Sequence, residues 1–192
     1  MKKVLIYFPE RKLAPKGGPA GYLYNLRQGL SQMEHSDIGI SFYDNAPVAL
    51  EENQFLRNMI PKRVKDFRRA VKFSKYLERR VPVDKILFDY DLIHFHSTED
   101  MYLNRELLSQ YKGKVVLTSH TPCVPYQEII GRLNPTDYKL FKKKIESLVQ
   151  IDKYAFERAD YIIFPCEEAE EPYFHTWPEY AQIREQSKMR YV

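Results

Sequence analysis

The sequence contains few cysteines and few glycines, and it has no long apolar run. The two cysteines, Cys123 and Cys166, lie far apart and form no CxxC pair. This usage is typical of free thiols in a reducing compartment, so we expect a cytoplasmic protein. The apolar run that begins at Val4 ends at Pro9, short of the roughly 7–15 residues of a secretory signal core. No window approaches the roughly 20 apolar residues that span a bilayer.

Two phosphate-binding motifs are also absent. Neither G-x-G-x-x-G nor G-x-x-x-x-G-K-[ST] follows the first apolar run, which argues against a nicotinamide fingerprint and a Walker A loop. The sequence has no internal repeat and no low-complexity tract. Its 192 residues, of which 44% are hydrophobic and 29% charged, are ordinary for a globular chain with one core, so we predict a single domain over residues 1–192.

Short apolar runs alternate with segments of helical spacing. Runs without polar interruption predict strands buried on both faces, as in a parallel sheet. The predicted strands are residues 3–8, 38–43, 91–96, 114–119 and 161–164. The predicted helices are 19–33, a basic helix within 57–80 that begins near Pro61, 99–111, 136–159 and a short acidic helix near Glu167, with a loop over 44–53 and an apolar stretch from 189. This order predicts an α/β fold with a Rossmann-like open, mostly parallel sheet and helices on both faces.

Three of the seven glycines, Gly17, Gly18 and Gly21, lie within five positions between the first predicted strand and the first predicted helix. In doubly wound sheets, ligands bind beyond the carboxyl ends of the strands. Glycine permits a positive φ and a close approach of the backbone to a ligand, and a helix that begins at Pro19 points unpaired N–H groups into the same space. The motif indicates either an anion site, most simply for phosphate, or only a tight turn.

Three of the five histidines end predicted strands. His94 and His96 share one face because strand residues two apart point the same way, and His120 ends the next strand. The polar run from Thr118 to Thr121 follows an apolar strand, which favours a ligand-facing role for His120. His94 is predicted to be a partly buried histidine that packs beneath the site.

A metal-dependent hydrolase that uses His94 and His96 is one alternative, because zinc hydrolases also place HxH at a strand end. A catalytic zinc typically has three protein ligands. The candidates for a third ligand are His120, Glu99, Asp100 and His175. There is no HxHxDH motif and no downstream histidine cluster, so the ligand count is not met and we expect no metal.

Several motifs occur in one order along the chain. VLIYFP…KGGPAGYLYNLRQGL resembles the first strand, Gly-Gly loop and first helix of the retaining glycosyltransferases with two Rossmann-like domains, the GT-B architecture. FDYDLIHFHS, VVLTSHTPCVP and IDKYAFERADYIIFPCEEAEE resemble that family's D-ϕ-ϕ-H-x-H-S strand, its T-x-H strand end and its E-x-x-A-D helix, where ϕ is apolar. KMRYV resembles the strand that crosses into the second domain. The chain is therefore similar to the N-terminal, acceptor-side domain of this large family of bacterial polysaccharide and lipid-linked sugar transferases.

The resemblance implies roles for particular residues. Gly17 and Gly18 would face the donor phosphates, and His120 would lie at the transferred sugar. The acceptor would be bound by Lys16, Ser97, Thr98, Glu99, Thr121 and Tyr126. The family's C-terminal domain, which holds the nucleotide-sugar, has no counterpart in residues 1–192, so we expect this chain alone not to transfer sugar. The nucleotide-sugar is a co-substrate, and no metal or other cofactor is expected.

Positive charge is concentrated in residues 57–80. This stretch carries ten basic and two acidic residues, whereas the whole chain has a formal charge of +4. A solvated helix face is one interpretation. The other is attachment to an anionic membrane surface, worth around 1 kcal/mol per basic residue near that surface, which would make the protein peripheral at the inner membrane face. No nucleic-acid motif accompanies the charge, so a nucleic-acid partner is not expected.

A non-catalytic subunit is the second alternative. Such a subunit would bind a glycan or a lipid-linked acceptor and pair with a catalytic partner. The sequence that the reading frame encodes after Val192 would distinguish this subunit from an enzyme half, because a second α/β domain with a glutamate pair favours the enzyme.

Overall fold

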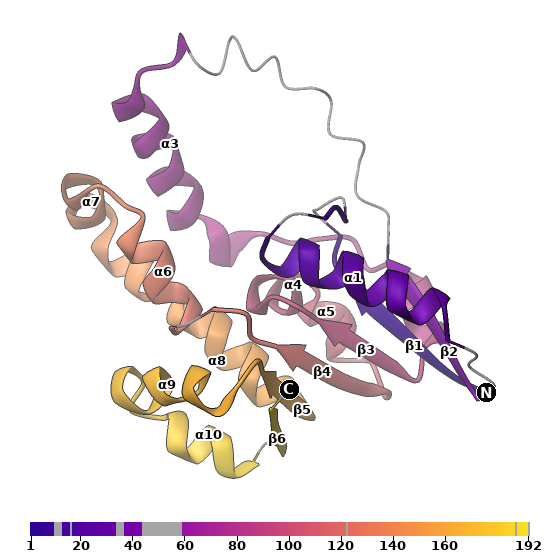
Figure 1. Ribbon diagram of the computed structural model, residues 1–192. Helices are drawn as coiled ribbons and strands as arrows, with labels where there is room; N and C mark the ends of the chain where they lie inside the picture. Colours follow the sequence, from indigo (N-terminus) through magenta and orange to yellow (C-terminus); the bar gives the residue numbers. More distant parts are fainter. Residues whose placement is uncertain are drawn as a thin grey trace.

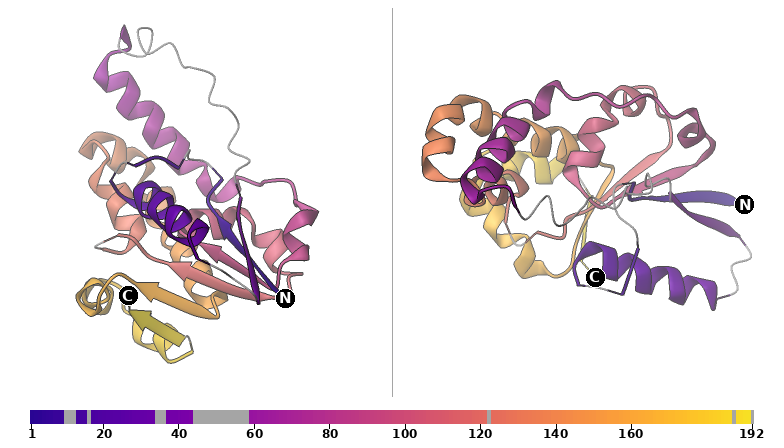
Figure 2. Two further views of the ribbon diagram at one scale, coloured as in Figure 1. Left: turned by 45° about the vertical axis from the view of Figure 1, so that its right-hand side comes forward. Right: turned by 90° about the horizontal axis from the view of Figure 1, so that it is seen from above.

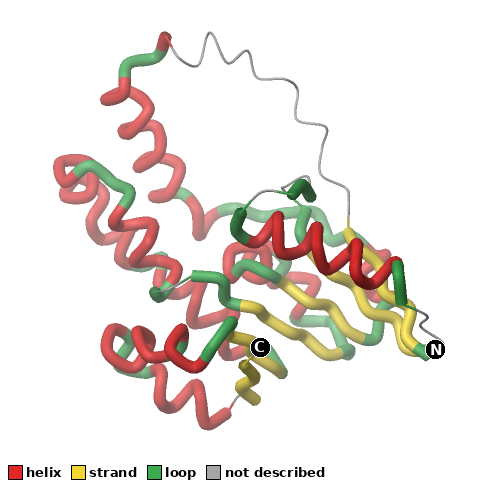
Figure 3. The backbone as a smooth tube through the Cα atoms, viewed as in Figure 1, coloured by secondary structure: helices red, strands yellow, loops and turns green. Residues whose placement is uncertain are grey.

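The computed structural model (Figure 1) describes residues 1–9, 13–15, 17–33, 37–43, 59–121, 123–186 and 188–191. At the centre of the protein is a six-stranded sheet in the order β2-β1-β3-β4-β5-β6, seen as yellow strands in Figure 3. The strands are β1 Lys2–Tyr7, β2 Ile38–Tyr43, β3 Leu92–Phe95, β4 Lys114–Thr118, β5 Tyr161–Phe164 and β6 Lys188–Tyr191. All neighbouring strands are parallel, which confirms the predicted open parallel sheet.

The five predicted strands are all present, and the apolar stretch from 189 lies in β6, the sixth. The central strands form because apolar residues are covered on both faces: Ile93, Phe95 and Leu117 are fully buried on one face, and Ile6 and Val116 are buried on the other. Tyr7 pairs with Phe95, and Phe95 pairs with Leu117. Strands β1, β3 and β4 therefore end at the same edge of the sheet, and this register brings the residues that follow them together.

Helices cover both faces of the sheet. Helix α1 (Pro19–Ser31) packs on one face, where Leu23 meets Ile6 and Phe8, and it lies below the strands in the right-hand view of Figure 2. The larger apolar cluster occupies the other face. It is covered by α4 Thr98–Leu103, α5 Arg105–Leu108, α8 Val149–Arg158, α9 Glu171–Thr176 and α10 Tyr180–Gln186. Two short 3-10 helices lie in connecting segments: η2 (Lys85–Asp89) precedes β3, and η3 (Glu167–Ala169) lies between β5 and α9.

Two predicted helices are each interrupted at a buried residue, so that each segment forms two shorter helices. The segment 136–159 forms two helices, α7 (Pro135–Glu146) and α8. Between them Leu148 is buried in the core, and backbone N–H groups there bond to the carbonyl three residues earlier instead of four. The segment 99–111 forms α4 and α5. Asn104 interrupts it, since its buried amide donates to the Tyr7 hydroxyl at 3.1 Å and to the Asp100 carbonyl at 2.9 Å.

The basic helix is shorter than predicted. It spans α3 (Lys62–Ser74) and is followed by the 3-10 helix η1 (Tyr76–Glu78). The start is set by Pro61, whose carbonyl accepts the first helical N–H bonds, and the hydroxyl of Ser74 donates to the Val71 carbonyl (2.9 Å) in the last turn. Arg57 and the predicted loop over 44–53 lie outside the described residues.

An additional helix, α6 (Pro125–Gly131), occupies a segment to which the sequence pattern assigned no helix or strand. Pro125 stands in its first turn, where a missing N–H costs nothing. Helices α3, α6 and α7 share a second apolar cluster that includes Ile129, Ile145 and Leu148. None of the helices in the described ranges combines the length and the apolar character required to cross a bilayer.

Candidate functional site

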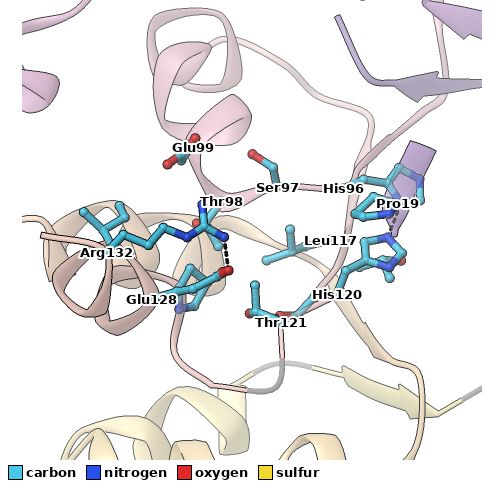
Figure 4. A pocket seen from close by; sticks show the side chains of 14 residues that line it. Pro19, His96, Ser97, Thr98, Glu99, Leu117, His120, Thr121, Glu128 and Arg132 are labelled. Atoms are coloured by element: carbon cyan, nitrogen blue, oxygen red, sulfur yellow. Dashed lines mark hydrogen bonds and ion pairs between the residues drawn. The ribbon is translucent and has the colours of Figure 1, made fainter. Parts of the chain in front are cut away.

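A cavity of about 290 Å³ lies at the carboxyl ends of β3 and β4 (Figure 4). Residues 96–99 after β3 and 119–121 after β4 line it, together with Pro19 at the start of α1 and one face of α6. This is the edge at which doubly wound sheets bind ligands. The lining is mainly hydroxyl, imidazole and carboxylate groups, with Leu117 and Ile129 as apolar walls.

Two histidines meet at one end of the cavity. The Nδ1 atom of His96 lies 3.0 Å from Nε2 of His120, and the two rings stack with centroids 5.3 Å apart. They meet because they follow neighbouring strands in register. The ring of His94 lies behind that of His96, 4.2 Å away between centroids, and its Nε2 is 2.7 Å from the hydroxyl of Thr118. His94 is thus hydrogen-bonded and half-buried beneath the site.

The three imidazoles are neutral at pH 7. Loss of hydration on burial lowers the pKa of His94 to about 4 and that of His96 to about 2, and the neighbouring imidazoles add to both shifts. Burial also lowers the pKa of His120. The facing nitrogens of His96 and His120 therefore share one N–H.

The other ring nitrogen of His96, Nε2, indicates which of the two histidines carries that shared proton. This Nε2 atom is buried and has no hydrogen-bond partner in the described part of the chain. A buried N–H without a partner is rarer in proteins than an unpaired acceptor, which favours a proton on Nδ1 of His96, donated to His120. His120 then carries its own proton on Nδ1, the ring nitrogen that His96 does not engage.

The start of α1 approaches the same end of the cavity. Gly18 caps the helix at φ 75° and ψ −165°, a conformation essentially restricted to glycine. Its carbonyl accepts N–H bonds from Gly21 and Tyr22, and Pro19 lines the cavity. The Tyr22 ring lies 5.4 Å from that of His120. The glycine pair therefore lies beside the histidines, although Pro19, and neither Gly17 nor Gly18, forms the cavity wall.

A buried carboxylate holds two walls of the cavity together. Asp152 of α8 is 1% exposed and accepts hydrogen bonds from the Thr98 hydroxyl (2.6 Å) and from the Tyr126 N–H (2.8 Å). These donors stand at the first turns of α4 and α6. Burial raises the pKa of Asp152 to about 7, against the opposing effect of its two hydrogen bonds. Asp152 positions both helices from outside the cavity.

The other end of the cavity carries an ion pair between Glu128 of α6 and Arg132, the residue that follows this helix, opposite the histidines in Figure 4. Sequence reasoning missed these two residues because it assigned no helix to residues 125–131. The signal was present: Pro125 suits a first helical turn, and a Glu followed four residues later by Arg is a helix-stabilising spacing.

Of the residues expected to bind the acceptor, Ser97, Thr98, Glu99 and Thr121 all line the cavity. The Ser97 hydroxyl also caps α4 by accepting the Asp100 N–H at 3.1 Å. Tyr126 is placed differently.

The Tyr126 ring packs against both large apolar clusters, and its backbone N–H is what bonds to Asp152. Its role at the cavity is therefore to fix α6 rather than to line the wall. Lys16 lies outside the described residues.

The geometry around the histidines does not resemble a metal centre. Within the described residues, no three His, Cys, Asp or Glu side chains gather as ligands. His94 and His96 instead direct one ring nitrogen each to Thr118 and His120.

An open parallel α/β domain with a polar cavity at the carboxyl ends of its central strands is a Rossmann-like domain with its ligand-binding edge open. Residues 16–179 match the family Glycosyltransferase Family 4, and the chain belongs to that family. The comparison with curated proteins gives no match.

Among solved structures, the chain is similar to sucrose-phosphate synthase from Thermosynechococcus elongatus, with a TM-score of 0.51 and 17% sequence identity. The alignment covers 100% of this chain and 48% of that one, so the chain spans about half the length of this relative. At this identity the likeness concerns the fold.

Proposed function

We propose that this chain is the acceptor-binding half of a retaining glycosyltransferase that moves a sugar from a nucleotide-sugar to a glycan or lipid-linked acceptor. The observation that carries the proposal is the cavity, where a neutral histidine and hydroxyl groups converge at the carboxyl edge of the sheet beside the start of α1 at Pro19. The family match supports sugar transfer. The alignment over 48% of a solved relative supports the division into halves.

The cavity suits a sugar hydroxyl surface. Its volume of about 290 Å³ is just below the range for ligand pockets, roughly 300–1,000 Å³, which fits part of a ligand that is shared with a second domain. Ser97, Thr98 and Thr121 offer hydroxyls that both donate and accept, and Glu99 adds a carboxylate. Such groups orient an acceptor hydroxyl, and orientation is a large part of transfer catalysis.

His120 would hold the transferred sugar. Its neutral ring is fixed by His96, so its remaining N–H can donate to a sugar oxygen without introducing a positive charge beside an oxocarbenium-like centre. The role is positioning, and no proton abstraction is assigned to this ring.

The leaving diphosphate develops negative charge during transfer. The start of α1 at Gly17 and Gly18 presents backbone N–H groups and the positive end of the helix dipole, which stabilise such charge without a metal ion. The nucleotide itself would be bound by a second α/β domain outside residues 1–192, and residues 1–192 alone would not turn over.

The test compares the polypeptide of the complete reading frame with residues 1–192. Turnover is measured for both with a panel of nucleotide-sugars, and acceptor binding is followed by chemical-shift changes at Ser97 and Thr121. We expect transfer by the complete polypeptide only, and binding of acceptor by both. Robust transfer by residues 1–192 would contradict the division into halves.

A third outcome of this experiment would favour the alternative function, a non-catalytic subunit. If the complete polypeptide binds glycan but never transfers sugar, the chain is a non-catalytic acceptor-binding subunit that works with a catalytic partner.

A further inference from the structure

Helices α3 and α7 form a two-helix layer that stands away from the sheet. They lie side by side in both views of Figure 2, and Figure 1 shows them at the end of the molecule that holds α6. The rings of Phe67 and Phe141 meet with centroids 6.0 Å apart, and Arg63 pairs with the buried Asp137. We call the outer surface of these two helices the α3–α7 surface.

The α3–α7 surface concentrates positive charge. The two helices contain ten basic and three acidic residues, so the rest of a chain whose formal charge is +4 is negative overall. All three acidic side chains are paired inside the layer: Asp66 with Arg69, Asp137 with Arg63 and Glu146 with Lys142. The basic side chains with no acidic partner among the described residues are Lys62, Lys65, Arg68, Lys72, Lys139 and Lys143.

Large apolar side chains are exposed among these charges. The exposed fractions are 41% for Val64, 42% for Phe67 and 65% for Leu140, and Met59 just before α3 is 67% exposed. Val64, Phe67 and Arg68 lie on one face of α3 because residues three and four apart are neighbours on a helix. Helical spacing alone does not decide whether Val64 and Phe67 are covered, so this exposure is a finding of the tertiary structure.

We propose that the α3–α7 surface docks the protein on an anionic lipid membrane. A helix with basic side chains around an exposed apolar stripe lies in the membrane interface, with charge drawn to anionic headgroups and apolar side chains entering the acyl boundary. A polyanion such as nucleic acid matches the charge but provides no apolar phase for Val64, Phe67 and Leu140. The lipid surface accounts for both features.

The docking surface is connected to the cavity. The guanidinium of Arg69 donates to the carbonyl of Arg132 at 3.3 Å, and the side chain of Arg132 lines the cavity. Docking would therefore hold the cavity close to the headgroups. The membrane proposal does not require sugar transfer. If the proposed function holds, it narrows the acceptor to a molecule carried by the lipid phase.

The experiment is co-sedimentation of the protein with vesicles of neutral phosphatidylcholine, and with vesicles in which about one-third of the lipid is phosphatidylglycerol. We expect binding to the anionic vesicles only, and weaker binding at higher salt because exposed charges are screened. Equal binding to both vesicles, or binding to neither at low salt, would overturn the proposal.

Two pairs of variants locate the surface. Arg68→Glu with Lys72→Glu should weaken binding about 30-fold or more, taking around 1 kcal/mol for each basic residue. The control, Lys85→Glu with Lys112→Glu, makes the same change in net charge at exposed lysines on η2 and before β4, and should bind like the wild type. Equal losses in both double variants would reduce the effect to net charge and contradict a local surface.

A second pair of variants tests the contribution of the exposed apolar side chains to membrane binding. Leu140→Ser should lower binding to anionic vesicles while leaving binding to a soluble polyanion, heparin, unchanged. Ile86→Ser, at another exposed apolar side chain (51% against 65% for Leu140), should lower neither. A protein that prefers heparin and ignores Leu140→Ser would be a polyanion binder, and the membrane proposal would be wrong. Circular dichroism confirms that each variant is folded, and none of these readouts depends on transferase activity.

Discussion

The Nδ1 atom of His96 lies 3.0 Å from Nε2 of His120, with the two rings inclined by 25°. Because both rings are neutral, the pair behaves as one hydrogen-bonded unit in which His96, at 4% exposure, holds the more exposed His120. This relationship sets which nitrogen of His120 faces away from the core, and it leads to the first two predictions.

His94 and His96 should remain unprotonated well below the ordinary imidazole pKa of about 6.5. In an NMR titration between pH 7 and pH 5, the ring signals of His94 should move by no more than about one-tenth of a full titration and those of His96 by less, since burial lowers their pKa values to about 4 and about 2. The unfolded chain takes up these protons near pH 6.5, so their contribution to stability is present above that pH and is lost as pH falls toward 4. Signals that titrate near pH 6.5 in the folded protein would contradict the burial argument.

His120→Ala should leave the fold intact and reduce turnover of the complete enzyme strongly, on the order of 100-fold or more, because an interaction with the reacting sugar is lost. His175→Ala is the matched control, since that imidazole lies exposed on α9, away from the cavity lining. Thermal melting and steady-state kinetics are measured on both. Unchanged kinetics in the His120 variant would remove this residue from the site.

Asp152→Ala should destabilise the protein by about 2–4 kcal/mol, because the Thr98 hydroxyl and the Tyr126 N–H lose their common acceptor. Asp152→Asn should cost much less, since its amide can accept from the Tyr126 N–H and donate to the Thr98 hydroxyl. Urea denaturation measures both changes. Equal losses in the two variants would show that an amide of the same shape cannot replace the carboxylate, and would contradict this hydrogen-bond argument.

The same Asp152 pair predicts a pH dependence of opposite sign to that of the histidines. The folded-state pKa, raised to about 7, means that the folded state holds the proton more tightly than the unfolded chain, whose carboxyl has a pKa near 3.8. Its contribution to stability is therefore full below about pH 4 and is lost as pH rises through 7. The free energy of unfolding of the wild type, measured relative to Asp152→Asn, should fall across this window, and a difference that rises or stays flat would refute the assignment.

Gly18→Ala should destabilise the protein by about 1–3 kcal/mol, because a φ of 75° with ψ near 180° strains any residue with a Cβ atom. Space is not the cause, as a Cβ atom at Gly18 would meet nothing within 4 Å. Gly17→Ala is the control: it also meets nothing within 4 Å and its φ is not positive, so its stability should stay within about 0.5 kcal/mol of the wild type. Equal effects of both substitutions, followed by urea denaturation, would contradict a strain specific to Gly18.

Much of the fold could be predicted from local pattern. The five apolar runs became strands with boundaries within two residues, since an uninterrupted apolar run is stable only when both faces are covered. The same pattern placed His96, Ser97 and His120 at one edge, because parallel strands in one sheet end together. The breaks at Asn104 and Leu148 were not predictable, since each depends on a partner far away in the sequence.

The sequence by itself determined the parallel α/β architecture and the edge that carries the cavity, because the apolar pattern and the alternation of strands and helices along the chain are local properties. Tertiary structure alone decided that α6 closes the cavity with Glu128 and Arg132, that Asp152 joins two of its walls, and that Val64 and Phe67 remain exposed on α3. These outcomes depend on which helix packs against which. An apolar stripe is buried only when a neighbour covers it, and a carboxylate becomes an anchor only where the fold places two donors beside it.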